Sequence, residues 1–164
     1  HLASKKGDFE VVQMLFEANG KKIDINVGDN AGWTALHFAS KSGNPEIVDA
    51  ILHYPGVNIN IEDQAGWTPL HDAVKYQNHD VIRILLNNPQ INVNAKTKSM
   101  WVPLHIAYLN HDQETKTMLE QMPGIIKDAK DSEGRTPEDL GNIPLFGSEE
   151  IDDSAPKLHY FNGC

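Results

Sequence analysis

Short segments with the apolar periodicity of an α-helix recur along the chain. Apolar side chains spaced three or four positions apart predict one helix in each of four places, namely residues 9–16, 47–52, 81–86 and 115–122. Pro55, Pro89 and Pro123 follow the last three segments. Proline has no backbone N–H to donate, so we expect each of these helices to end before it.

A shorter helix is predicted before each of these segments. A threonine that can cap a helix is followed by Ala or Pro at the first helical position, at Thr34, Thr68 and Thr136. The helix after Thr34 is expected to end near Gly43, and the helix after Thr68 near Gln77. The corresponding helix before residues 115–122 is expected to end near His111. In the latter two places a left-handed backbone conformation has to be adopted without glycine.

The helix pairs are separated by segments of alternating polarity. Residues 57–60 and 91–94 alternate apolar residues with Asn, which predicts an extended arm, and the arm leads into a Gly-containing turn such as 63–66. Each unit is therefore predicted to be a helix, a turn, a second helix and an extended hairpin.

These units repeat every 34 residues. The sequence Ala-Gly-Trp-Thr-Ala-Leu-His at 31–37 recurs at 65–71 as Ala-Gly-Trp-Thr-Pro-Leu-His, at 99–105 as Ser-Met-Trp-Val-Pro-Leu-His, and weakly at 133–139. Repeats of this length predict a solenoid in which each unit packs only on its neighbours. We expect units at residues 1–28, 29–62, 63–96 and 97–130, a partial cap at 131–146, and a flexible acidic tail at 147–164.

The repeated motif resembles the ankyrin repeat. The resemblance rests on Thr-Pro-Leu-His at 68–71, Ala73, Gly43-Asn44 and Glu46-Ile47-Val48, and it covers residues 1 to about 140. It implies an all-α ankyrin-repeat solenoid of helix-turn-helix pairs with extended β-hairpin loops. Met100 departs from the pattern because it replaces the hairpin glycine of the fourth unit.

Composition narrows the classes of function. The net charge of −9 argues against binding to nucleic acid or to anionic membranes, which requires a positive field. The only cysteine, Cys164, cannot form an internal disulfide, so we expect a cytoplasmic or nuclear location. The chain begins at His1 in the middle of a repeat, which is typical of a piece of a longer protein, and we expect a monomeric segment.

The histidines do not indicate catalysis. His1, His37, His71 and His105 hold the same position in successive units, which predicts a repeated structural role as a bond to the neighbouring turn. His79-Asp80 and His111-Asp112 are interpreted as solvated turns. With no nucleophile, phosphate-binding or metal-binding motif, we expect no enzyme activity, no metal and no cofactor.

The ankyrin resemblance implies which residues line the concave, partner-binding face. The predicted partner-binding residues are Trp33, Trp67, Trp101, Lys41, Lys75, Tyr76, Lys5, Lys6, Leu109 and Arg135. The resemblance also places Asn110, which follows Leu109, on this face. Three exposed tryptophans about 10 Å apart would leave slots for a partner's side chains, and the lysines favour an acidic or aromatic peptide segment. Alternatively, the tryptophans cover the capped helix and the next hairpin, or the acidic residues 149–153 fold back onto this face.

The same resemblance implies one modification. Asn26, Asn60 and Asn94 occupy the hairpin position that oxygenases hydroxylate in some members of the family, and their simpler role is to bond the turn between units. The predicted function is that of a non-enzymatic scaffold or adaptor that binds a protein. The alternatives are a recognition or regulatory segment of a larger enzyme or channel, and a bacterial effector.

Overall fold

The computed structural model describes residues 24–144. Residues 1–23 of the first predicted unit, including His1, Lys5 and Lys6, and the predicted acidic tail lie outside the described residues. Seven helices occupy the described part of the chain: α2 (Ala35–Ser42), α3 (Pro45–Leu52), α4 (Pro69–Lys75), α5 (His79–Asn87), α6 (Pro103–Leu109), α7 (Gln113–Glu120) and α8 (Pro137–Gly141).

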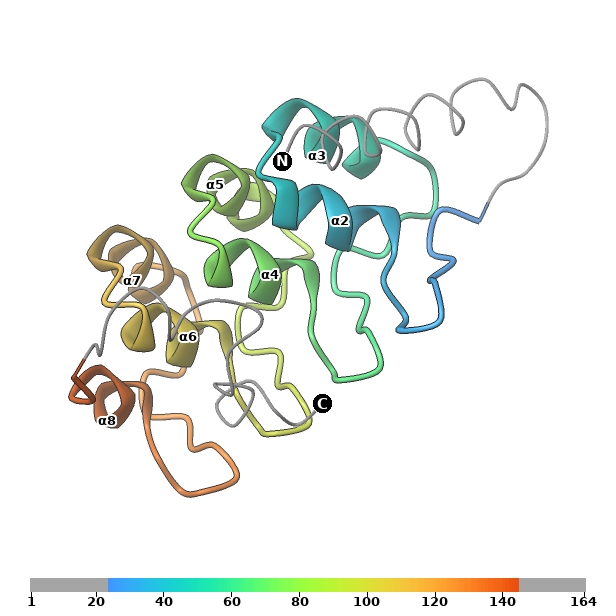
Figure 1. Cartoon of the computed structure of the whole chain (residues 1–164). Helices are drawn as coiled ribbons and strands as arrows, with labels where there is room; N and C mark the ends of the chain where they lie inside the picture. The colour runs from blue at the N-terminus through green and yellow to red at the C-terminus, as the bar shows by residue number, and fades with distance from the viewer. Residues whose placement is uncertain (1–23, 145–164) are drawn as a thin grey trace.

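The helices form two rows (Figure 1). One row consists of α2, α4, α6 and α8 in chain order, and the other of α3, α5 and α7, each helix touching the next in its row. Long loops project from one side of the stack and lie beside one another. Within residues 24–144 no strand is present. The hairpins are turns, and one backbone hydrogen bond joins each to the next, such as that from the Lys98 N–H to the Ala65 carbonyl oxygen at 2.9 Å. The expected all-α ankyrin-repeat solenoid is confirmed.

Caps of two kinds begin the helices. In the first row, the hydroxyl of Thr68 accepts a hydrogen bond from the backbone N–H of His71 at 3.4 Å, and Pro69 follows at the first helical position. In the second row, the side chains of Asn44 and Asp112 accept from the backbone of α3 and α7. These local bonds fix where α3, α4 and α7, each of seven or eight residues, begin.

The first-row helices end in the left-handed conformation that the repeat pattern predicts. Gly43 has φ of 77°, and Gln77 and His111, which stand in its place, have φ of 55° and 54°. Met100 replaces the hairpin glycine and adopts φ of 63°. The turn geometry is nevertheless kept, because the Met100 N–H donates to the carbonyl oxygen of Thr97 at 2.8 Å, as Gly66 N–H does to Asp63 at 3.0 Å.

The core lies between the two rows and continues through the stack. Leu70, Ile82, Leu85 and Leu104 are fully buried in it. The second-row helix predicted at 115–122 ends two residues earlier, at Glu120. Residues 121–122 form a turn there, since the Met122 N–H donates to the Leu119 carbonyl oxygen at 3.0 Å.

Candidate partner-binding face

Five side chains of the second and third units form a continuous group, here called the Lys–aromatic cluster: Trp33, Lys41, Tyr76, Lys75 and Trp67. The ammonium nitrogen of Lys41 lies 5.5 Å from the ring centroid of Trp33 and 5.3 Å from that of Tyr76. The ammonium nitrogen of Lys75 lies 5.6 Å from the centroid of Trp67 and 5.2 Å from that of Tyr76. The Tyr76 ring therefore contacts two cations from neighbouring units.

The cluster is held in place by two asparagines. The Asn78 carboxamide donates to the carbonyl oxygens of Ser40 and Lys41, at 2.7 and 2.9 Å, and so closes the end of α2. The Asn110 carboxamide donates in the same way to Val74 and Lys75, both at 3.2 Å, at the end of α4. The backbone that carries each lysine is thus fixed by the following unit.

Asn110 was expected from the repeat alignment to be a surface contact, and this is wrong because its side chain is buried, with 6% exposure. The helix-closing role was missed. A comparison of positions 34 residues apart does not indicate this role, because Asn78 and Asn110 are 32 residues apart.

The expectation that all three tryptophans are exposed is also wrong. Trp33 is half-buried, but Trp67 and Trp101 retain only 5% and 1% of their surface. Trp101 lies 6.1 Å from the ring of His105, and its indole N–H donates to the Asp131 carboxylate of the next hairpin at 3.1 Å. Trp101 therefore follows the alternative interpretation, in which the tryptophan covers the capped helix and the next hairpin.

Two of the other predicted contacts have packing or pairing roles of their own. Leu109 is half-buried against the core. Arg135 occupies the tryptophan position of the fifth unit, but its guanidinium group pairs with Asp131 at 2.9 Å and with Glu133 at 3.1 Å. That pairing closes its own hairpin, which gives Arg135 a local structural partner.

The repeated histidines link successive units, as predicted. In His71, Nδ1 accepts from the backbone N–H of Thr68 at 3.1 Å, so Nε2 carries the proton and donates to the carbonyl oxygen of Trp101 at 3.0 Å. Burial lowers the pKa of His71 to about 4. Burial also lowers the pKa of His37 and of His105, although each bonds a carbonyl oxygen of the next unit.

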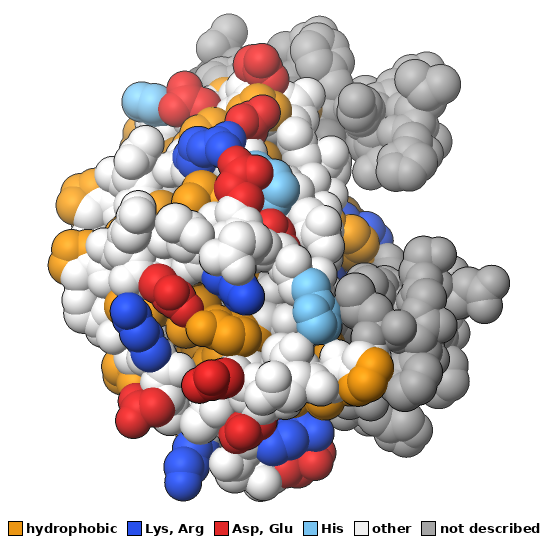
Figure 2. Space-filling model, turned by 90° about the vertical axis from the view of Figure 1, so that its left-hand side faces the viewer, with side chains coloured by type: hydrophobic (Ala, Val, Ile, Leu, Met, Phe, Trp, Pro, Cys, Tyr) orange, Lys and Arg blue, Asp and Glu red, His pale blue; other side chains and the backbone are white. Residues whose placement is uncertain are grey.

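His79 and Asp112 were expected to lie in solvated turns, and this is wrong because the two side chains pair with each other. His79 Nε2 lies 2.8 Å from the Asp112 carboxylate, and its Nδ1 lies 3.1 Å from the carboxylate of Glu114. Arg83 joins the group by pairing with Asp80 and Glu114. Figure 2, which views the molecule from the left-hand side of Figure 1, shows acidic and basic side chains interspersed on that face of the molecule.

Burial raises the pKa of Asp112, but hydrogen bonds from Thr115 and His79 outweigh that effect, and the net shift is downward. Asp112 is the N-terminal cap of α7 and bonds the Thr115 backbone and hydroxyl. This group ties α5 to α7.

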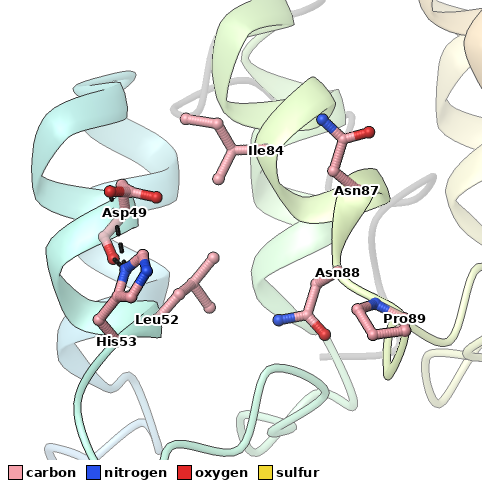
Figure 3. A pocket seen from close by; sticks show the side chains of 7 residues that line it. All are labelled: Asp49, Leu52, His53, Ile84, Asn87, Asn88 and Pro89. Carbon is pink, nitrogen blue, oxygen red and sulfur yellow. Dashed lines mark hydrogen bonds and ion pairs between the residues drawn. The ribbon is translucent and has the colours of Figure 1, made fainter.

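A groove of about 340 Å³ lies between α3 and α5 (Figure 3). The groove is lined by the apolar side chains of Leu52 and Ile84 and by Asp49, His53, Asn87, Asn88 and Pro89. His53 Nδ1 bonds the backbone oxygen of Asp49 at 2.7 Å. The lining residues include no Ser, Cys or Lys that would serve as a nucleophile.

Among residues 24–144, no three His, Cys, Asp or Glu side chains gather closely enough to hold a metal ion. No helix in the same part of the chain has the length and apolar character needed to cross a membrane.

Residues 1–97 match the family described as ankyrin repeats, in three copies. The chain belongs to the ankyrin-repeat family. Ankyrin repeats are generally non-catalytic modules that bind other proteins. The histidine links, the capped short helices and the projecting hairpins described above are the features that build such a stack.

Ankyrin repeats similar to this one occur in proteins of different kinds. A stretch of 52 residues is 48% identical to the SMC5-SMC6 complex localization factor protein 1 of Mus musculus. Another match, 44% identical over 52 residues, is to the transient receptor potential cation channel subfamily A member 1 of Homo sapiens. A third, 35% identical over 57 residues, is to a "probable serine/threonine-protein kinase" of Dictyostelium discoideum.

These matches are short on both sides. They cover 32%, 32% and 34% of this chain, and 5%, 4% and 7% of the respective relatives. The similarity therefore concerns the repeats and not the remainder of those proteins.

Proposed function

We propose that this ankyrin-repeat stack is a non-enzymatic adaptor that binds a protein partner through the Lys–aromatic cluster. The observation that supports it is the placement of the Tyr76 ring against the ammonium groups of both Lys41 and Lys75. Cation–aromatic contacts of this kind are each worth about 0.5–1 kcal/mol at exposed sites. They hold two flexible side chains near one geometry, so less conformational entropy is lost on binding.

The chemistry of the cluster favours a partner segment that carries carboxylates beside an apolar or aromatic residue. Lys41, Lys75, Tyr76 and Trp33 are half-buried and so keep part of their surface for contact. Trp67 contributes by packing against Lys75 from beneath. Opposite charge speeds encounter, whereas aromatic surface slows dissociation. Lys5, Lys6, Leu109 and Arg135 stay proposed as contacts at the edges of the same face.

The test is capture of proteins from a cell lysate by the wild-type chain and by two variants. The cluster variant carries Lys41→Gln, Lys75→Gln and Tyr76→Ala. The charge-matched control carries Lys96→Gln and Lys116→Gln, which lie on other parts of the stack. We expect a protein that the wild type and the control capture and the cluster variant loses, with all three chains equally folded by circular dichroism.

Two results would contradict the proposal. One is capture of the same protein by all three chains, which would place binding elsewhere. The other is a protein that the Lys96 and Lys116 control loses as readily as the cluster variant, which would indicate non-specific charge attraction. The identified partner is then titrated against each chain, and we expect the cluster variant to bind more weakly by at least tenfold, or about 1.4 kcal/mol.

A second candidate function is that of a recognition or regulatory segment within a larger protein. The three relatives support it, because the stretches that match this chain make up only 4–7% of a localization factor, a channel and a probable kinase. A bacterial effector that uses the repeats inside a host cell belongs to the same class. Sequencing the complete transcript tests it, and a messenger that encodes no further domain would contradict it.

We also propose that the segment is monomeric, acts in the cytoplasm or nucleus, and binds neither nucleic acid nor membranes. The charge of −9 supports the last part. Light scattering on the purified chain, a fluorescent fusion in cells, and sedimentation with anionic vesicles or DNA test these points. A dimer, secretion, or co-sedimentation would contradict them in turn.

A further inference from the structure

The chain carries its own segment of the chemistry that the Lys–aromatic cluster would bind. Residues 148–154 read Ser-Glu-Glu-Ile-Asp-Asp-Ser and bring four carboxylates around one isoleucine. We propose that residues 148–154 dock on the Lys–aromatic cluster and compete there with the partner. The inference rests on the proposed function, since it assigns an internal occupant to the same face.

The order of residue types in the two surfaces is complementary. In the cluster, the Tyr76 ring contacts two ammonium groups, each a little over 5 Å from its centroid. In an extended segment, alternate side chains point to the same face. Glu149, Ile151 and Asp153 then share one face, with the apolar side chain between two carboxylates. Ile151 would lie on the Tyr76 ring while the two carboxylates pair with Lys41 and Lys75.

The segment is long enough to reach the cluster. The described part of the chain ends at residue 144, just after α8. Helix α8 packs on α6, and α6 packs on α4, which carries Lys75. Neighbouring helices are separated by about 8–10 Å, so two steps amount to roughly 20 Å. The chain from residue 144 to Ile151 spans up to about 24 Å, at roughly 3.3–3.6 Å per residue.

Weak contacts suffice for such docking because both surfaces belong to one molecule. A short flexible connection gives an effective concentration in the millimolar range. Lys41 and Lys75 are only half-buried, so salt should weaken the contact between the lysines and the carboxylates. The Debye length falls from about 10 Å at 0.1 M to about 3 Å at 1 M ionic strength.

The experiment places a nitroxide spin label in the complete chain. Ser154→Cys combined with Cys164→Ser leaves one thiol for labelling, directly after the acidic residues. Amide NMR spectra then report which residues approach the label. We expect strong broadening at Lys41, Lys75 and Tyr76, and little at Asp49 and His53, which lie on α3 and the turn that follows it.

Three labelled variants identify the cause. Substituting Glu149→Gln, Glu150→Gln, Asp152→Asn and Asp153→Asn should remove the broadening at the cluster, as should Lys41→Gln with Lys75→Gln. The matched control Lys116→Gln removes a lysine that also contacts a tyrosine, at 4.5 Å from the Tyr108 centroid. It should leave the broadening unchanged, and 1 M salt should reduce it in the wild type.

Broadening that is equal at Tyr76 and His53, or that survives neutralisation of the acidic residues, would overturn the inference. Loss of broadening in the Lys116→Gln control would also overturn it, because net charge rather than the cluster would then be responsible. None of these results bears on partner capture by the cluster variant, so failure of the inference is distinguishable from failure of the proposed function.

Discussion

His71 Nε2 lies 3.0 Å from the carbonyl oxygen of Trp101, a residue that is thirty positions further along the chain. The same bond joins His37 to Trp67 at 2.9 Å and His105 to Arg135 at 3.0 Å. Each imidazole therefore fastens the start of one first-row helix to the hairpin of the next unit.

Replacement of His71 by alanine should destabilise the chain strongly. The Thr68 N–H and the Trp101 carbonyl oxygen would both lose a partner in a buried place, and a cavity would form. Together these effects predict a loss of about 2–4 kcal/mol in the free energy of unfolding. Urea denaturation measures it. His53→Ala is the control, because that side chain is 77% exposed and its loss should change stability by less than about 0.5 kcal/mol.

Stability should fall in mildly acidic solution. The pKa of His71 is lowered by burial from 6.5 to about 4, so between these values the unfolded chain binds a proton that the folded chain does not. The contribution of His71 is fully present above pH 6.5 and is lost as the pH falls toward 4. At about 1.4 kcal/mol per pH unit, the loss is on the order of 3 kcal/mol. His37 and His105, whose pKa is also lowered by burial, add to it.

Urea titrations at pH 7, 6 and 5 measure this dependence. The slope should be smaller in His71→Ala, which has one buried histidine fewer. The lowered pKa of Asp112 acts in a separate window, since its contribution is lost only as the pH falls below 3.8. A free energy of unfolding that stays constant from pH 7 to pH 5 would show that the histidines do not resist protonation.

Met100→Gly should stabilise the chain. Met100 has φ of 63°, and the equivalent Gly32, Gly66 and Gly134 have φ between 77° and 80°. A left-handed conformation costs a residue with a Cβ about 1–2 kcal/mol, whereas glycine adopts it freely but loses more entropy on folding. The net expectation is a gain of roughly 0.5–1 kcal/mol. Thermal unfolding measures it. Met100→Ala keeps the Cβ and the strain, so a similar gain in that variant would contradict the explanation.

The carboxamide of Asn60 joins two units, and Asn60→Asp should weaken the joint. Its Nδ2 donates to the carbonyl oxygen of Gln90 at 2.8 Å, and its Oδ1 accepts from the N–H of Asn92 at 2.8 Å. A carboxylate keeps the second bond but places negative charge against the Gln90 oxygen. We expect a loss of about 1–2 kcal/mol by urea denaturation.

Asn58→Asp is the matched control for that substitution. Asn58 Oδ1 accepts from the N–H of Asn60 at 3.0 Å, a role that a carboxylate retains. It should change stability by less than about 0.5 kcal/mol. If both substitutions were equally harmful, added charge rather than the lost donor would be the cause.

Periodicity was sufficient to predict the stack. The 34-residue spacing placed Gln77 in the position of Gly43 and predicted its left-handed backbone, and the structure confirms this. The bonds that Asn26, Asn60 and Asn94 make to the next unit also follow the prediction. Equivalent positions in a repeat share backbone geometry, which is why such local features transfer from one unit to another.

The repeat predicted less well how deeply a side chain is buried and which residues make contact between units. The tryptophan position was recognised, but whether Trp67 and Trp101 are covered depends on the hairpin of the following unit, such as Asp131 beside Trp101. The pairing of His79 with Asp112 was missed because His111-Asp112 was compared with His79-Asp80. Counting in steps of 34 instead aligns Asp112 with the helix caps Asn78 and Asn44, and that count was available in the sequence.

The links between units have a consequence for how the chain is made. The bonds from histidine to carbonyl join residues thirty apart, and those from Asn78 to α2 join residues up to 38 apart. Contacts of such short sequence separation favour rapid folding. During synthesis from the N-terminus, each unit finds every one of these partners as soon as about one more repeat has left the ribosome. The stack can therefore grow behind the ribosome one unit at a time, without waiting for the C-terminus.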